Sequence, residues 1–365
     1  MEVGRAVPPR GGIASKGTDI RSRPYRLLVV VSVVVLAACT TGRPETGPPR
    51  APSVDPRIGG TLLVFTGFRS GLATIELPGD DPRPLMLPEE GAFARDAFFL
   101  PDGSVLALLQ LGIDRIGAFV LTEDDPPVAL GPPLRGEFTF SLSGDRLLAA
   151  RCVPRPNAFV LDLTAPSDSW RETPGSCGGM LSPEGDAVVW SPNGRVLLGA
   201  AVEGGGDAES VLDVAELSNM PPGMDEGVSM IGTLDWGPQG IAIPLGTNER
   251  QAAVVMTPDG NVNVTALGNR GAGLGAALAW QPGGELLASG AWSNLEAAVR
   301  LSSGDETRVV AIHPDPIAGL VWSPDGEVLL AASNTRWTFV ASDGTWLRSV
   351  PVPRGESLPL AWRYP

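Results

Sequence analysis

The 365-residue sequence repeats one short phrase, an aromatic residue followed by x-Pro-Asp-Gly, at intervals of about forty residues. Its clearest copy runs from Trp322 to Gly326 and reads Trp-Ser-Pro-Asp-Gly. Proline presets the first corner of a turn, aspartate bonds back to the local backbone, and glycine accepts a positive φ. The phrase therefore predicts a tight turn between two strands. Recurrence at this period is typical of a repeat architecture, and a four-stranded propeller blade has about this length.

The phrase and its weaker copies can be followed along the chain by the large apolar residue that stands two places before the proline. These markers are Phe99, Phe140, Leu181, Trp236, Trp280, Trp322 and Trp362. The interval after Leu181 is the longest and contains a second copy of the phrase at Trp190, so either this unit carries an insertion or its frame differs. Each unit holds four short apolar runs, which predicts a small sheet that needs neighbours stacked against it.

The two ends of the repeat region are complementary. The last marker, Trp362, has no strand after it, and residues 59–65 look like the second strand of a unit without its first. Residues 358–363 and 61–87 together would make one complete blade. We therefore expect an all-β fold, a seven-bladed β-propeller over residues 59–365, closed by pairing of the N- and C-terminal strands. Closure of this kind removes exposed sheet edges.

The N-terminal region has the pattern of an export signal. Residues 21–26 are basic, residues 27–38 are almost wholly apolar, and Cys39 follows. Twelve such residues are too few to cross a bilayer, which takes about twenty, but they suit a secretory signal. The run from Leu36 to Cys39, Leu-Ala-Ala-Cys, resembles the lipobox of bacterial lipoproteins. The resemblance implies a signal peptide over residues 1–38 and lipidation at Cys39; the alternative is an uncleaved short anchor with an incidental cysteine.

Residues 39–58 are rich in proline and small polar residues, which favour an extended spacer over a packed element. The predicted organisation is thus a signal peptide, a tether from the lipidated cysteine, and a propeller. The predicted location is the extracytoplasmic face of the cell membrane, periplasmic or at the cell surface. The membrane is the first expected partner, through the N-terminal lipid.

Composition argues against several classes of function. The net charge of −14 disfavours nucleic acid as a partner. His313 is the only histidine, which excludes a histidine-rich zinc site, and its neighbours indicate a turn. The sequence has no G-x-S-x-G, H-E-x-x-H or Walker motif. We therefore expect no catalytic residues, no metal site and no cofactor.

Propellers usually bind partners through one rim or the mouth of the central channel. The polar residues expected in the rim loops between second and third strands are Asp114, Arg115, Arg155, Asn157, Asn248, Glu249, Arg250, Trp292 and Asn294. Trp292 is either an exposed interface anchor or a residue packed between blades. Cys152 and Cys177 are either a disulfide, which an exported protein permits, or two free thiols. The run from Ser342 to Trp346 is read as a plain turn.

The phrase at Trp322–Gly326 resembles the WD-like repeat of TolB-type propellers, and the resemblance covers roughly residues 59–365. TolB carries an additional α/β domain that has no counterpart here, so a role in the Tol system is not implied. The function expected is a non-enzymatic scaffold at the cell envelope that binds a protein or another ligand, with an envelope protein or a glycan as partner. The alternatives are a propeller enzyme, a metal- or carboxylate-dependent hydrolase or lyase, and a carbohydrate-binding propeller.

Overall fold

The computed structural model divides the chain into two units, Met1–Ala51 and Pro52–Pro365. It describes residues 54–67, 71–79, 81–151, 157–164, 170–173, 179–183, 188–190, 195–199, 209–213, 217, 220–224, 228–230, 234–257, 260–269, 277–292, 296–304, 306–353 and 358–364. The regular elements of these residues are all strands. None of the described residues belongs to a helix that could cross a membrane.

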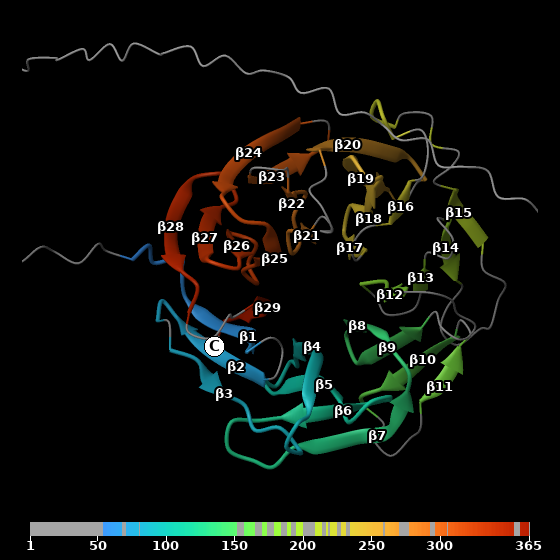
Figure 1. Cartoon of the computed structure of the whole chain (residues 1–365), viewed down its shortest axis with the longest axis vertical. Helices are drawn as coiled ribbons and strands as arrows, with labels where there is room; N and C mark the ends of the chain where they lie inside the picture. Colours follow the sequence, from blue (N-terminus) through green and yellow to red (C-terminus); the bar gives the residue numbers. More distant parts are fainter. Residues whose placement is uncertain are drawn as a thin grey trace, which may run out of the picture. The chain divides into compact units, whose positions relative to one another are not determined.

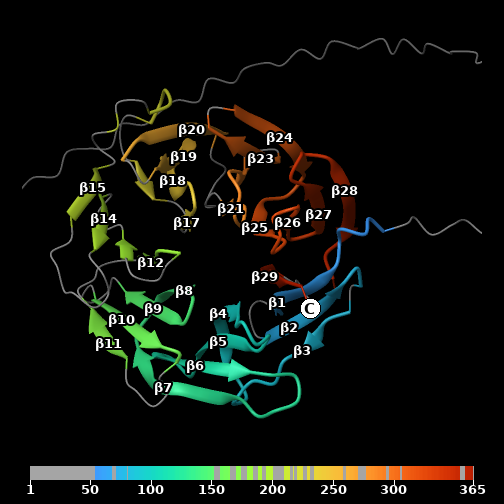
Figure 2. The same ribbon diagram turned by 180° about the vertical axis from the view of Figure 1, so that it is seen from behind.

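The strands form antiparallel sheets that follow one another around a common centre, as Figure 1 shows and Figure 2 shows from behind. The first contains β29 (Leu358–Arg363), β1 (Gly60–Thr66), β2 (Gly71–Leu77) and β3 (Arg83–Pro84). The second contains β4 (Phe93–Phe99), β5 (Val105–Gln110), β6 (Arg115–Leu121) and β7 (Val128–Arg135). The third contains β8 (Thr139–Ser143), β9 (Arg146–Arg151), β10 (Asn157–Asp162) and β11 (Arg171–Thr173).

The remaining sheets continue the circle. The fourth contains β12 (Gly179–Leu181), β13 (Val188–Trp190), β14 (Arg195–Gly199) and β15 (Glu209–Asp213). The next is built from β16 (Ser229–Met230), β17 (Asp235–Gly237), β18 (Gly240–Gly246), β19 (Arg250–Met256) and β20 (Val262–Asn269). Then come β21 (Ala277–Trp280), β22 (Leu287–Trp292), β23 (Ala297–Ser303) and β24 (Glu306–His313), and last β25 (Ile317–Trp322), β26 (Val328–Ser333), β27 (Arg336–Ala341) and β28 (Trp346–Pro351).

The expectation of a seven-bladed propeller is wrong: among the described residues, the four-stranded blades number six. The described sheets are six four-stranded blades and one five-stranded sheet around β18. There the innermost position is shared by β16, where Ser229 faces Gly246, and β17, where Asp235 faces Ala242. The register between the two pieces differs by two residues, so they cannot form one ladder. Pro244, which has no N–H to donate, lies in β18 between the residues that pair with β16 and those that pair with β17.

The predicted pairing of the two ends of the chain is confirmed. Strand β29 pairs antiparallel with β1, and the register places Leu62 opposite Trp362 and Phe65 opposite Leu358. Each marker residue also lies in the innermost strand of its sheet; Leu181 ends β12, whereas Trp190 ends β13. The frame that starts from Leu181 is therefore the right one for the long unit.

The core consists of hydrophobic clusters that lie between neighbouring sheets. In β5, Leu106 and Leu108 pack toward the sheet of β9, while Ala107 and Leu109 pack toward the sheet of β1. Successive side chains of a strand point to opposite faces, so a strand with a neighbour on both sides needs an uninterrupted apolar run. The same arrangement joins the last sheet to the closing one, where Leu330 and Leu62 share a cluster.

The recurrent phrase forms the turn that its residues predict. The Oγ of Ser323 donates to Oδ1 of Asp325 at 2.6 Å, and the main-chain N–H of Glu327 donates to the same oxygen at 3.0 Å. Gly326 has a φ of 71°, which favours glycine. The indole Nε1 of Trp322 donates to the carbonyl of Ala279 at 3.0 Å and so links β25 to β21. The phrase thus makes a turn and also joins two blades.

Candidate functional site

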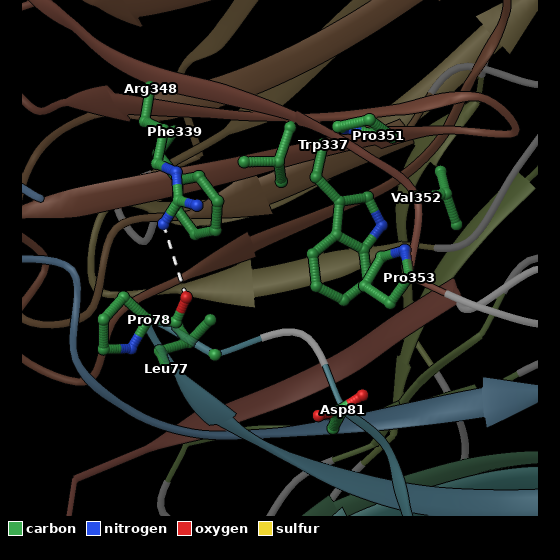
Figure 3. Close-up of a pocket in the computed structure, with 11 residues that line it drawn as sticks. Leu77, Pro78, Asp81, Trp337, Phe339, Arg348, Pro351, Val352 and Pro353 are labelled. Carbon is green, nitrogen blue, oxygen red and sulfur yellow. Dashed lines mark hydrogen bonds between the residues drawn. The ribbon is translucent and has the colours of Figure 1, made fainter. Parts of the chain in front are cut away.

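A groove lies where the closing sheet meets its neighbour, between the end of β2 and the outer strands β27 and β28 (Figure 3). It has a volume of about 340 Å³. We call it the joint groove and define it by its lining residues: Leu77, Pro78, Gly79, Asp81, Trp337, Phe339, Arg348, Val350, Pro351, Val352 and Pro353. Residues from both ends of the chain meet here only because β29 completes the sheet of β1.

The wall of the joint groove is aromatic. Trp337 and Phe339 are two residues apart in β27 and therefore point to the same face of that strand. Both belong to the cluster between the two sheets and are only 1% exposed. The ring of Phe339 also meets the ring of Trp362 edge to face, with centroids 6.0 Å apart. Because the rings are fixed by this packing, the wall is preformed.

The mouth of the joint groove carries both signs of charge. Nη1 of Arg348, a partly buried residue of β28, donates to the carbonyl of Pro78 at 3.3 Å across the groove (Figure 3). Among the described residues this is the one hydrogen bond of its guanidinium, which has five N–H groups. Asp81 lies on the opposite side and is exposed. The site can therefore hold an apolar group and pair with a polar group at its edge.

The repeat provides a comparison for Arg348 one blade earlier. Nη2 of Arg308, in β24, donates to the carbonyl of Ser342 at 2.7 Å. This bond joins the sheet of β24 to the sheet of β27, just as the bond of Arg348 joins the sheet of β28 to the sheet of β2. The hollow beside Arg308 is lined by Leu286, Leu301, Ser303, Glu306, Thr307 and Arg308, without an aromatic side chain. The hydrogen bond from an arginine to the neighbouring sheet thus occurs in both blades, whereas aromatic residues line only the joint groove of these two sites.

A second pocket, of about 280 Å³, lies among the innermost strands of four successive sheets. We call it the inner-strand pocket; it is lined by Phe98, Phe140, Ser141, Leu142, Ser143, Met180, Leu181, Ser182, Pro183, Asp235 and Trp236. Oδ2 of Asp235 accepts the main-chain N–H of Trp280 at 2.6 Å. Burial raises the pKa of the Asp235 carboxyl, although the main-chain N–H groups of Trp280 and Trp236 act in the opposite direction. This carboxylate was not singled out from the sequence.

The predicted rim residues that the structure describes belong to different sheets. Asp114 and Arg115 lie at the loop before β6, and Asn248, Glu249 and Arg250 at the turn before β19; all five side chains are exposed. Trp292 ends β22, is partly buried against the cluster between that sheet and the sheet of β26, and its carbonyl accepts a bond from Gln251 at 2.9 Å. Trp292 therefore packs between blades while remaining partly exposed, and a role in binding stays a prediction.

Several predicted residues cannot be placed. Cys39, Cys152, Cys177, Arg155 and Asn294 lie outside the described residues, as does the side chain of Asn157. The proposed lipidation and disulfide therefore stay predictions. Among the described residues there is no group of three or more His, Cys, Asp and Glu side chains arranged to hold a metal ion.

Two exposed apolar residues were missed by sequence reasoning. Ile113, beside Asp114 in the rim loop, is 97% exposed, and Trp346, the first residue of β28, is 59% exposed. Trp346 follows the turn of Ser342–Thr345, where the N–H of Thr345 bonds to Oδ1 of Asp343 at 2.8 Å, so the reading of a plain turn is confirmed. An apolar residue flanked by glycine and aspartate is the signal that could have identified Ile113.

No protein-family model and no curated protein matches this chain. Solved structures are similar to it. A functionally unknown protein from Desulfotomaculum acetoxidans has 10% identity and a TM-score of 0.54, over 83% of this chain and 99% of that one. A protein from Lactobacillus plantarum has 14% identity and a TM-score of 0.52, over 82% and 100%. TolB from Acinetobacter baumannii has 14% identity and a TM-score of 0.47; the match covers 83% of this chain and 66% of TolB, just under two thirds. At such identities the likeness shows a propeller fold alone.

Proposed function

We propose that this protein is a lipid-anchored, extracytoplasmic propeller that binds a partner without chemical turnover, using the joint groove. The observation that carries the proposal is the combination of an apolar groove, backed by the buried rings of Trp337 and Phe339, with an arginine at the mouth. Such a combination of preformed apolar surface and a few polar groups is typical of binding pockets. The partner that fits this groove is an envelope protein with an apolar segment that enters the groove and an acidic group that pairs with Arg348.

The anchor rests on the sequence from Arg21 to Cys39. One acyl chain alone binds a membrane only marginally, and two or more bind it durably. Replacing Cys39 with Ala should move the protein from the membrane fraction to the soluble fraction, while Thr40→Ala should leave it at the membrane. Retention of the Cys39→Ala protein would refute the anchor.

The groove is tested with a matched pair of arginine variants. Full-length Arg348→Ala and Arg308→Ala each lose one hydrogen bond from a guanidinium to a carbonyl of the neighbouring sheet, at corresponding places in two blades. After crosslinking in cells, we expect the partner captured by the parent protein to be lost with Arg348→Ala and kept with Arg308→Ala. Equal capture by both variants would contradict use of the groove.

The second candidate is a propeller enzyme, and Asp235 is the observation that favours it. A carboxyl group whose pKa is raised by burial, in a pocket among the inner strands, suits a general acid or base. Assays of lactone and ester hydrolysis with the parent protein and Asp235→Asn separate the candidates. If the parent protein hydrolyses a substrate and Asp235→Asn does not, the protein is an enzyme and the scaffold proposal is wrong.

A further inference from the structure

The inner-strand pocket combines one acidic group with a largely aromatic and apolar lining. Among its lining residues Asp235 is the only charged side chain, and Phe98, Phe140 and Trp236 contribute three rings from three sheets. All four residues line the pocket and are partly exposed as whole residues, although the carboxyl of Asp235 is largely buried. Such a lining is attractive to a positive charge with an apolar exterior.

Two other polar groups of the pocket, Ser141 and Ser143, link the third sheet to residues 181 and 183. The Oγ of Ser141 accepts the N–H of Leu181 at 3.1 Å, and the Oγ of Ser143 donates to the carbonyl of Pro183 at 2.7 Å. Asp235 also accepts hydrogen bonds, but its donors are neutral main-chain N–H groups. It forms no ion pair with any side chain in the described part of the chain. When the Asp235 carboxyl is ionised, hydrogen bonds therefore hold it in place, but no cationic side chain among the described residues neutralises it.

The oxygen ligands that the pocket offers suit some kinds of cation better than others. Calcium takes six to eight oxygen ligands and magnesium a near-ideal octahedron, whereas this pocket has one carboxylate and three serines. An ammonium ion that carries alkyl groups gains instead from ring faces within about 6 Å and from a single counter-charge. The volume of about 280 Å³ is at the lower end of the range for ligand pockets, which restricts the ligand to a small molecule.

We propose that the inner-strand pocket is a binding site for a small organic ammonium ion, held by the Asp235 carboxylate and by the rings of Phe98, Phe140 and Trp236. The site is independent of the membrane anchor and of the joint groove, and it assigns a class of ligand to the pocket in which the second candidate places Asp235. Binding requires the ionised carboxylate. Because burial raises the pKa of Asp235, affinity should fall on acidification at a higher pH than for an exposed aspartate.

The test is calorimetric titration of the full-length protein, in detergent and at constant ionic strength, with tetramethylammonium chloride and with tert-butanol, its neutral counterpart of similar shape. We expect tetramethylammonium to bind and tert-butanol not to bind. Asp235→Asn keeps an oxygen to accept the N–H of Trp280 and should weaken tetramethylammonium binding by about tenfold or more, equivalent to about 1.4 kcal/mol. Phe98→Leu should weaken it less.

The matched control is Asp145→Asn, which removes the same charge from an exposed position in the turn between β8 and β9. It should bind tetramethylammonium like the parent protein. Circular dichroism and the melting temperature establish that each variant is folded. The proposal is overturned if the parent protein does not bind tetramethylammonium, if tert-butanol binds equally well, if folded Asp235→Asn retains full affinity, or if Asp145→Asn loses as much as Asp235→Asn.

Discussion

The hydroxyl of Tyr364 donates a hydrogen bond of 3.0 Å to Oδ2 of Asp325, so the end of the chain is joined to the turn of the clearest repeat phrase. The neighbouring Arg363 reaches the other way: its Nη1 donates to the carbonyl of Gly103 at 2.7 Å, and its guanidinium lies 4.7 Å from the centroid of the Phe99 ring. Two consecutive residues after Trp362 therefore connect the closing sheet to the sheets on both of its sides.

Tyr364→Phe removes only the hydroxyl and should lower the free energy of unfolding by about 0.5–1.5 kcal/mol, the usual value for one hydrogen bond. Chemical denaturation of the parent protein and the variant measures it. The bond also contributes a pH dependence. Burial raises the pKa of Asp325, but bonds from Ser323, Glu327 and Tyr364 outweigh it and hold the pKa below its usual value.

The stability due to Asp325 is thus present above the unfolded pKa of about 3.9 and is lost as the pH falls through the lower folded value. Asp325→Asn should flatten this acid limb of the stability curve. An unchanged acid limb in that variant would refute the assignment.

Gly326→Ala should be clearly more destabilising than Gly304→Ala. Both glycines have positive φ, 71° and 55°, so each alanine costs about 1–2 kcal/mol of backbone strain. A Cβ on Gly326 would also come within 2.8 Å of Cγ of Gln281 and 3.1 Å of the Pro282 carbonyl, whereas a Cβ on Gly304 meets nothing within 4 Å. The extra crowding should add about 1–3 kcal/mol. Equal losses in thermal unfolding would show that blade packing does not constrain this turn.

Acidification from neutral pH should destabilise the protein through His313. This residue is 1% exposed, and neither of its ring nitrogens has a hydrogen-bond partner among the residues that the structure describes. Burial lowers its pKa, as does the charge of Arg336, while Asp315 opposes them. The unfolded chain takes up a proton below a pH of about 6.5 and the folded chain does so only at lower pH, so stability falls across that interval. Stability curves that coincide for the parent protein and His313→Gln between neutral pH and pH 5 would contradict this.

Trp337→Ala should cost about 3–5 kcal/mol because it leaves a cavity under the joint groove, whereas Arg348→Ala should change stability by less than about 1 kcal/mol. The second substitution removes a single, long hydrogen bond at a partly exposed residue. Urea unfolding distinguishes the two. A large loss in Arg348→Ala would mean that the arginine supports the fold, and its use as a binding probe would then fail.

Much of the fold could be predicted because its determinants are local and repeated. Trp322, Trp280 and Trp362 mark innermost strands, and the incomplete units at the two ends predicted that residues 358–363 lie beside residues 61–66. The division of the innermost strand before Trp236 could not be predicted from the markers, since they specify one strand per unit. Pro244, in the strand that pairs with both pieces, was the available clue.

The candidate sites were less predictable because each is assembled from distant parts of the chain. Pro78 and Arg348 meet across the joint groove only after the ring is closed, and no pattern near either residue indicates the other. Asp235 stands directly before a marker residue, where the pattern predicts only a strand. Its carboxyl accepts a hydrogen bond from Trp280, which belongs to the next sheet. Exposure of Ile113 likewise depends on how its loop leaves the sheet.

Hydrogen exchange of the full-length protein, followed by mass spectrometry, tests the closure of the ring most directly, and with it the joint groove. Pro359 has no N–H, and the alternate amides of β29 face away from β1. The other amides of residues 358–363 point toward β1, where they are bonded because β29 closes the ring, and they lie beside a packed cluster. They should be as strongly protected as those of residues 60–66, and both segments should open together. Exchange of residues 358–363 at the rate of an unstructured peptide, while residues 60–66 stay protected, would contradict closure of the ring by these strands.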